Sequence, residues 1–414
     1  MGGLDYNNAL AIFFPFYVAA EIPSNLMMKW TRPSLWIPFI MLLWGFCCVM
    51  LGVVKNYAGL MAVRALLGVA EGGLFPGITF YITQWYRRQE CGLRMAIFFS
   101  AATAAGAFGG LLARAIQEMK NVAGLASWQW IFILEGIATF IVGGSAFYFM
   151  YDYPDTAKFL SNQERIEVHR RLEADRSSLA DEFDLKYFMH AMKDWKIWVH
   201  CISTVGIFTP LYSFSLFLPT IIKTLGYTNN TAQLMTVPPY VVACAFCIGA
   251  GYAADKHGQR GIYMIFFSLL SVSGFIMLIA SESAHVKYGG TFLAASGIYP
   301  NVPQCVAWNG NNIGGSTKRS VGIAMQVMIG NLGGVISAYL FLPKDSPHFG
   351  SGHAALIGLN SMSAVLSVGM TLYLRRENRR RDRAAVKKIE EYTAEEKMAE
   401  REMGDSASFF RYTV

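Results

Sequence analysis

Arg64 and Glu71 are the two residues whose types and spacing most readily suggest chemistry. Both lie in an apolar run from about Ala58 to Thr83, which is long enough to cross a bilayer as a helix of roughly 20 residues. A separation of seven residues makes almost two helical turns, so both side chains share one face, about 10 Å apart along the axis. Charges inside a membrane cost a few kcal/mol each and normally face a polar cavity or a partner. We interpret the pair as a substrate and proton site, and a structural ion pair between helices remains the alternative.

The residues between this pair indicate how the face is positioned. Gly68 and Gly72 form a Gly-x-x-x-Gly pattern, which allows another helix backbone to approach closely. A carboxylate in an apolar cavity can bind and release a proton near neutral pH. Arg64 could pair either with Glu71 or with a substrate carboxylate, and switching between the two would link a proton to an anion. This coupling is a hypothesis.

The composition indicates a polytopic helical membrane protein. Of 414 residues, 54% are hydrophobic and only 15% are charged, and the apolar runs repeatedly reach about 20 residues. The net charge of +7 comes from basic residues in short loops and in the tail, which is typical of the cytoplasmic side of a membrane and not of nucleic-acid binding. The seven cysteines are irregularly spaced and lack histidine partners, so no metal site or disulfide framework is indicated. No phosphate loop or nucleophile triad supports ATP-driven or enzymatic function.

The chain divides into two groups of spans around a charged centre. We expect membrane spans at residues 8–28, 35–54, 58–83, 93–113, 129–151, 197–222, 235–254, 261–280, 288–308, 320–342 and 354–374. These predict an N-terminal bundle at 1–153, a central linker at 154–194, a C-terminal bundle at 195–375 and a tail at 376–414. The Lys and Arg bias places the linker and the tail in the cytoplasm. Charges at helical spacing predict exposed helices at 163–175 and 384–403.

The loop after span 235–254 carries a recognisable pattern. Residues 251–260 fit Gly-x-x-x-Asp-x-x-Gly-x-Arg, which resembles the loop motif of the major facilitator superfamily. Gly251 permits close helix packing, Asp255 can meet a helix N-terminus, and Arg260 is expected on the basic inner side. We assign a gating role to this motif and to its degenerate first-half copy, through Gly251, Asp255, Gly258, Arg260, Asn25 and Lys29.

Five further stretches resemble the anion:cation symporter family, and within it the fungal allantoate, nicotinate and pantothenate permeases. They are Pro23–Leu26, Arg64–Gly77, Ser100–Thr103, Trp130–Gly136 and Trp308–Asn312, and the similarity runs from Leu4 to about Arg375. The resemblance implies an all-α membrane protein with the major facilitator fold, in two bundles of about five and six transmembrane helices, the first bundle lacking its first helix. It also implies that Arg64 and Glu71 match an Arg and a proton-coupling Glu of the family, and that Asn331 lies near the substrate.

The remaining candidates come from polar residues within spans. Glu135 is another intramembrane carboxylate, which could relay protons or simply pair with Arg64. In the second half, Tyr212 is expected to line the cavity, and Trp308 is a candidate for substrate contact, with gating or packing as its alternative. Glu21 is expected to serve packing or gating because it lies nearer the inner end of its span. The first half of the chain would then supply the charged groups of the site, and the second half would supply neutral polar groups.

These observations predict a secondary transporter that is not an enzyme. The expected activity is proton-coupled symport of a small organic anion, such as a vitamin precursor or a ureide, by alternating access. The proton gradient is the energy source, with no cofactor or metal. The expected setting is the lipid bilayer of the plasma membrane, as a monomer and without nucleic acid. A shortened inactive product, or a nutrient sensor on the same scaffold, is the alternative interpretation.

Overall fold

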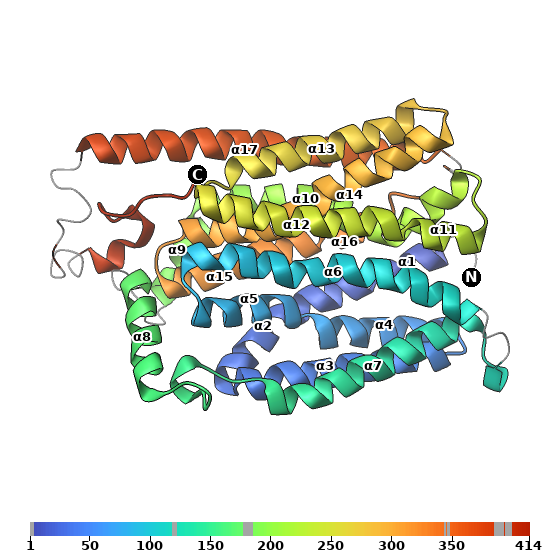
Figure 1. Ribbon diagram of the computed structural model, residues 1–414, viewed down its shortest axis with the longest axis horizontal. Helices are drawn as coiled ribbons and strands as arrows, with labels where there is room; N and C mark the ends of the chain where they lie inside the picture. The colour runs from blue at the N-terminus through green and yellow to red at the C-terminus, as the bar shows by residue number, and fades with distance from the viewer. Residues whose placement is uncertain are drawn as a thin grey trace.

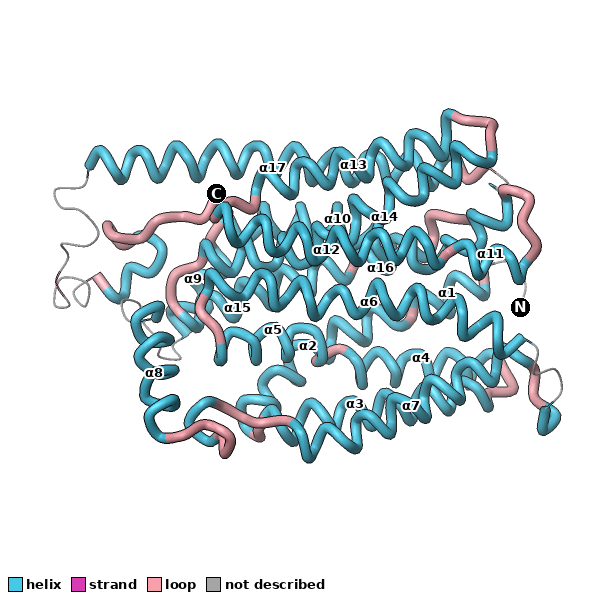
Figure 2. The backbone as a smooth tube through the Cα atoms, viewed as in Figure 1, coloured by secondary structure: helices cyan, strands magenta, loops and turns pink. Residues whose placement is uncertain are grey.

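The computed structural model describes residues 4–117, 122–176, 185–342, 345, 348–384, 393 and 400–414, and in these the regular structure is helical (Figures 1 and 2). The α-helices of the first part are α1 (Asp5–Ala11), α2 (Phe13–Trp30), α3 (Pro33–Val53), α4 (Tyr57–Glu71), α5 (Leu74–Trp85), α6 (Arg88–Gln117) and α7 (Ser127–Phe149). Next come α8 (Asn162–Arg176) and α9 (Leu185–Lys193). The remaining helices are α10 (Trp195–Thr224), α11 (Asn229–Met235), α12 (Val237–His257), α13 (Gly261–Ala280), α14 (Ala284–Asn312), α15 (Ser316–Asn331), α16 (Gly333–Ala338) and α17 (Gly350–Ala384).

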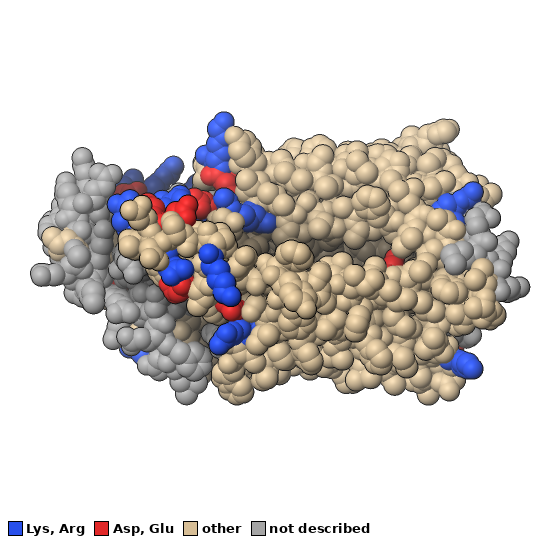
Figure 3. Space-filling view, turned by 60° about the horizontal axis from the view of Figure 1, so that its bottom comes forward, with Lys and Arg blue, Asp and Glu red and all other residues tan. Residues whose placement is uncertain are grey.

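The helices match the expected pattern of membrane spans. Ten stretches of the described chain are long and apolar enough to cross a bilayer, five before α8 and five after α9. A sixth helix of the second part, α14, is as long as its neighbours and packs between α12 and α13. Its buried amides bond inside the protein, as Asn301 does to Ser268 at 3.0 Å, which explains its lower hydropathy. Figure 3 shows a broad band of uncharged side chains between ends that carry Lys and Arg.

The helices form two bundles that run side by side. In the first part α3 packs along α7, and α2 lies against α4; in the second part α13 lies between α14 and α17. The two parts meet where α6 packs on α12 and where α2 reaches α15 (Figure 1). The all-α architecture in two bundles expected from the sequence is therefore confirmed.

Two of the expected spans are interrupted at the candidate site residues. The span at 58–83 consists of α4 and α5, which are separated at Gly72 and Gly73, directly after Glu71. The span at 320–342 consists of α15 and α16, and the break at Leu332 directly follows Asn331. At both places the backbone of Gly72, Gly73 and Leu332 stays in the right-handed helical region, so each is a local turn within one span.

The helix expected in the linker is present, whereas the helix expected in the tail stays a prediction. The exposed helix expected at 163–175 is α8, whereas the one expected at 384–403 lies mostly outside the described residues. Helix α17 continues to Ala384, ten residues past the expected end of its span. From residue 400 the chain folds back onto the bundle, where Ala407, Phe410 and Tyr412 are buried (Figure 2). These buried side chains lie beyond the stretch expected as an exposed helix, so that expectation stays a prediction.

Candidate functional site

The face of α4 that carries Arg64 is positioned by its glycines. A Cβ atom on Gly68 would lie 3.0 Å from the backbone nitrogen of Tyr17 and would also meet the carbonyl of Phe13. A Cβ on Gly72 would meet the carbonyl of Tyr17 and would lie 3.2 Å from the Cβ of Ala20. Helix α2 is thus the partner that the Gly-x-x-x-Gly pattern predicts, and it approaches α4 backbone to backbone.

Arg64 and Glu71 lie on this face without forming the structural ion pair that was the alternative interpretation. Both side chains are half-buried, and among the described residues neither makes a hydrogen bond or an ion pair. The Nε atom of Arg64 is buried without a partner. A guanidinium has five N–H donors and no acceptor, so Arg64 retains its capacity to bind an anion.

The second part contributes a pair of neutral polar side chains next to this face. The hydroxyl of Tyr212 in α10 donates to Oδ1 of Asn331 in α15 at 2.7 Å. Tyr212 also packs edge-on against Phe14 of α2, with the ring centroids 4.8 Å apart. Through Phe14 this pair lies against α2, the helix that packs on α4 and on Gly68.

Glu21 belongs to this region, although its sequence position suggested packing or gating. It lies in the second half of the span Asp5–Met28, nearer the inner end, as expected from the sequence. The side chain is 0% exposed, and Nδ2 of Asn331, which is 2% exposed, lies 3.4 Å from its Oε2 atom. The sequence signal that could have found it is a carboxylate within an apolar run, the same signal that identified Glu71.

Two other predicted residues do not join this region. Glu135 in α7 is exposed and its carboxylate makes no hydrogen bond within the described structure. Trp308 is buried near the C-terminal end of α14. Its Nε1 donates to the carbonyl of Thr413 at 2.9 Å, and its ring packs on His200. Among the roles considered for Trp308, this position favours packing over substrate contact.

The loop motif joins the two parts of the molecule. A Cβ on Gly251 would meet the Cβ of Ala96, so α12 and α6 approach closely there. Oδ2 of Asp255 accepts a hydrogen bond from the N–H of Leu93, near the start of α6, at 2.7 Å. Gly258 ends α12 in a left-handed conformation with φ of 62°.

Arg260 directly precedes α13, and its contacts go beyond the expected place on the basic inner side. Its side chain is buried, paired with Asp255, and donates to Gln304 at 2.8 Å. In the degenerate first-half copy, Asn25 is half-buried beside Gly77. The side chain of Lys29 lies outside what the structure describes.

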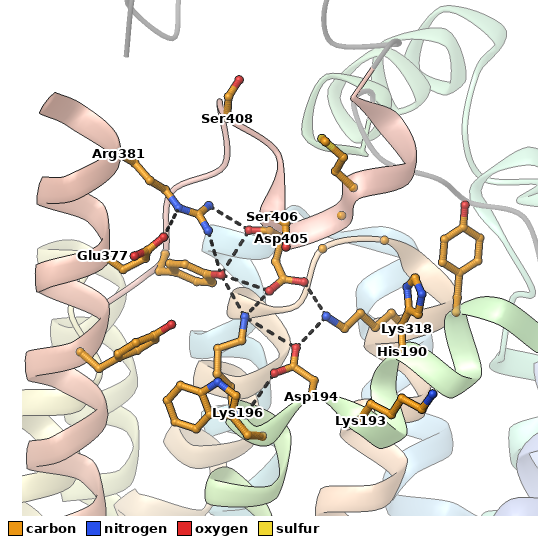
Figure 4. A pocket seen from close by; sticks show the side chains of 18 of the residues that line it. His190, Lys193, Asp194, Lys196, Lys318, Glu377, Arg381, Asp405, Ser406 and Ser408 are labelled. Carbon is orange, nitrogen blue, oxygen red and sulfur yellow. Dashed lines mark hydrogen bonds and ion pairs between the residues drawn. The ribbon is translucent and has the colours of Figure 1, made fainter. Parts of the chain in front are cut away.

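A cavity of about 730 Å³ lies elsewhere, between the returning tail and the bundle (Figure 4). Lys318 contacts Asp194 at 2.7 Å and Asp405 at 2.6 Å, and Lys196 pairs with the same two carboxylates. Burial opposes ionisation of Asp405, but Lys196 and Lys318 outweigh it and lower the pKa of this carboxyl below its usual value. Because these charges neutralise one another, we assign the cluster to tail docking and not to substrate binding.

Comparisons with known proteins agree with the fold. A family model described as Major Facilitator Superfamily matches residues 2–338. The MFS transporter prlL of a fungal species is 36% identical over 92% of this chain and 78% of its own length. The major facilitator-type transporter hxnP of Emericella nidulans is 30% identical over the same shares of the two chains. The solved structure of the proton:xylose symporter XylE superposes with a TM-score of 0.69 over 90% of this chain and 85% of that one, at 15% identity. Within the described residues, no cluster of His, Cys, Asp and Glu could hold a metal ion.

Proposed function

The chain belongs to the major facilitator superfamily, and we propose that it carries a small organic anion across the membrane together with protons. Its family and relatives are transporters, so the chain is a multi-pass membrane transporter and not an enzyme. The proposal adds the class of substrate and the coupling ion to that conclusion.

The proposal rests on the guanidinium of Arg64, which has no ion-pair partner within the described structure. An arginine inside a membrane normally has an acidic partner, yet Arg64 makes no ion pair in the described structure and its Nε is buried without a hydrogen bond. A substrate carboxylate would supply the missing partner through two parallel N–H···O bonds. A neutral substrate would leave the charge uncompensated, which makes an anion the favoured cargo.

Tyr212 and Asn331 supply the second half of the proposed site. An amide and a phenol can donate to or accept from a substrate without adding charge. Their mutual hydrogen bond at 2.7 Å holds both groups in place before the substrate arrives. A site with one cation and two neutral polar groups agrees with the resemblance to allantoate, nicotinate and pantothenate permeases, whose substrates are carboxylates with polar, uncharged bodies.

Glu71 is the proposed proton carrier of the same site. It shares one helix face with Arg64, so a proton on Glu71 removes the charge that competes with the substrate for the guanidinium. Binding of proton and anion would then reinforce each other. When Glu71 loses its proton on the less acidic side, its carboxylate again competes for the Arg64 guanidinium, and the anion is released.

The test is uptake by cells or proteoliposomes that contain this protein. A panel of labelled allantoate, nicotinate, pantothenate, biotin and a dicarboxylate is offered with an inward proton gradient, and with the gradient collapsed by a protonophore. We expect one carboxylate to accumulate only with the gradient. Arg64→Gln should strongly reduce that uptake at low substrate concentration, whereas Lys55→Gln, at an exposed cation just before the same span, should leave it unchanged. Transport of neutral solutes alone would contradict the proposal.

A further inference from the structure

Glu21 is a buried carboxylate that the proposed site does not use, and it stands at the boundary between the two parts of the molecule. The nearest hydrogen-bond donor is Nδ2 of Asn331, 3.4 Å from Oε2, and that donor comes from the other part of the chain. The second oxygen, Oε1, is buried without any partner. A fully buried carboxylate with one long hydrogen bond is an exception that calls for a physical explanation.

The orientation of the Asn331 amide is fixed by its hydrogen bond with Tyr212. Tyr212 donates its hydroxyl proton to Oδ1 of Asn331 at 2.7 Å, which identifies the other amide atom, facing Glu21, as the NH₂ group. Tyr212 is itself held by its ring contacts with Phe14 and Phe208. The donor that Glu21 meets is therefore preorganised by α10 and α15, and closure of the two parts brings the carboxyl to it.

The groups that face Glu21 offer no compensating charge. The nearest groups are Tyr17 on its own helix, Tyr212 on α10 and Asn331 on α15. Glu71 on α4 lies near the same two tyrosines. Within the described residues no Lys, Arg or His pairs with Glu21; Arg64, the cation of α4, makes no ion pair. An ionised carboxylate in such a place carries a large desolvation cost, whereas a neutral carboxylic acid still accepts the amide N–H. The contact between Glu21 and Asn331 is therefore more favourable when Glu21 is protonated.

We propose that Glu21 is the group whose protonation permits closure of the two parts, so that it couples the proton to the conformational step. The inference rests on the proposed function and adds a second role to it. Glu71 sets the affinity for the anion at Arg64, and Glu21 sets the equilibrium between the closed and open arrangements. A proton taken up from the acidic side neutralises Glu21 and allows it to enter the contact with Asn331. When the other side opens, water reaches the carboxyl, the proton leaves, and the charged form resists closure until the next proton binds.

The experiment separates binding from the conformational step by measuring transport in two modes. Counterflow of a labelled anion against the unlabelled anion needs no proton gradient, whereas accumulation does. For Glu21→Gln, which mimics the protonated acid, we expect counterflow with KM within about twofold of the unchanged protein. We expect its accumulation ratio to fall to about 1 and its maximal rate to lose pH dependence. Glu135→Gln, at an exposed carboxylate, is the matched control and should still accumulate.

The possible results are distinguishable. Accumulation by Glu21→Gln at the level of the unchanged protein, or loss of counterflow in a correctly folded variant, would overturn the assignment to Glu21. If Glu21→Gln does not fold, Glu21→Asp replaces it. This variant keeps a titratable group farther from Asn331 and should accumulate with a shifted pH profile; an unshifted profile would contradict the inference. Counterflow by the unchanged protein that ignores pH would refute the proton coupling itself, and absence of any anion counterflow would refute the proposed function.

Discussion

Asp255 of α12 accepts a hydrogen bond at 2.7 Å from the backbone N–H of Leu93 in α6, and it pairs at the same time with the buried Arg260. One carboxylate thus joins the loop motif of the second part to the first part of the molecule. The contact lies near the beginning of α6, where the helix dipole favours a negative charge.

Replacement of Asp255 by Asn tests whether this contact acts as a gate. The variant loses the charge-assisted bond and leaves Arg260 buried without an ion pair, at a cost of about 3 kcal/mol to the closed arrangement. We expect the rate of transport to fall about tenfold while KM stays unchanged, as measured by initial uptake rates. Lys256→Gln, at an exposed cation of the same loop, is the control. An Asp255→Asn variant with a normal rate would exclude the gating role.

Replacement of Arg64 by Gln tests the anion site. Charged hydrogen bonds contribute about 1.5–3 kcal/mol, so we expect KM for the transported anion to rise roughly tenfold to hundredfold. The measurement is the concentration dependence of counterflow. If KM is unchanged, the substrate carboxylate binds elsewhere.

Replacement of Glu71 by Gln tests coupling at the binding step. The amide is always neutral, so KM should lose its dependence on pH and uphill uptake driven by a pH gradient should disappear. Exchange should remain, because Arg64 is then permanently free for the anion. Uphill uptake that survives in Glu71→Gln would assign the coupling to another group.

Replacement of Gly68 by Val tests the close approach of α4 and α2. The added side chain meets the carbonyl of Phe13 and the backbone of Tyr17, which cannot move aside independently. Overpacking of this kind typically costs about 1–3 kcal/mol. We expect a lower midpoint of thermal unfolding in detergent, whereas Gly144→Val, where a Cβ meets nothing within 4 Å, should unfold like the unchanged protein. Equal midpoints for both variants would show that the helices separate easily at Gly68.

Docking of the tail is expected to depend on pH through Asp405. The pKa of Asp405 is lowered from its ordinary value of 3.8, so its contribution to docking is fully present above that value and is lost as the pH falls through the lowered pKa. Hydrogen exchange of the amides of Tyr412 and Thr413, which donate to Asn378 and Asn312, should therefore be slow and unaffected by undocking from neutral pH down to about pH 4. Loss of protection between pH 7 and 5 would contradict this account.

Asp405→Asn should weaken docking at every pH, because Lys196 and Lys318 then lose one of their two carboxylates. Removal of one partner from a buried charge network costs about 3 kcal/mol. Glu400→Gln, which keeps a hydrogen-bonding side chain near the exposed Ser408, is the matched control. Equal protection in both variants would assign docking to the apolar side chains alone.

The sequence predicted the features that depend on local spacing. Apolar runs located the spans, and Gly68 with Gly72 indicated a close helix contact without identifying its partner. Glu21 and Asn331 are 310 residues apart, and nothing in the local pattern shows that α2 turns this face toward α15. Arg260 was expected only on the basic inner side, because its role as the partner of Gln304 and Asp255 depends on the packing of α14 against α12.

The roles assigned to the site residues from the resemblance stay predictions, and the structure adds only where those residues lie. Tyr212 and Asn331 are brought together, whereas Glu135 and Trp308 are not. The docking of residues 404–414 was not predicted, because it depends on a few apolar side chains and on backbone hydrogen bonds, neither of which has a periodic signature.

The last residues of the tail are part of a packed contact, which matters for how the protein is handled. The carbonyl of Val414 accepts a hydrogen bond from the N–H of Arg260 at 2.6 Å, and Thr413 is bound on both sides by Asn312. A purification handle or a fluorescent protein fused directly after residue 414 would begin inside that contact, beside the loop motif. Reporter fusions at this end would therefore disturb the region that they are meant to observe, unless a flexible spacer lets the final residues return to their places.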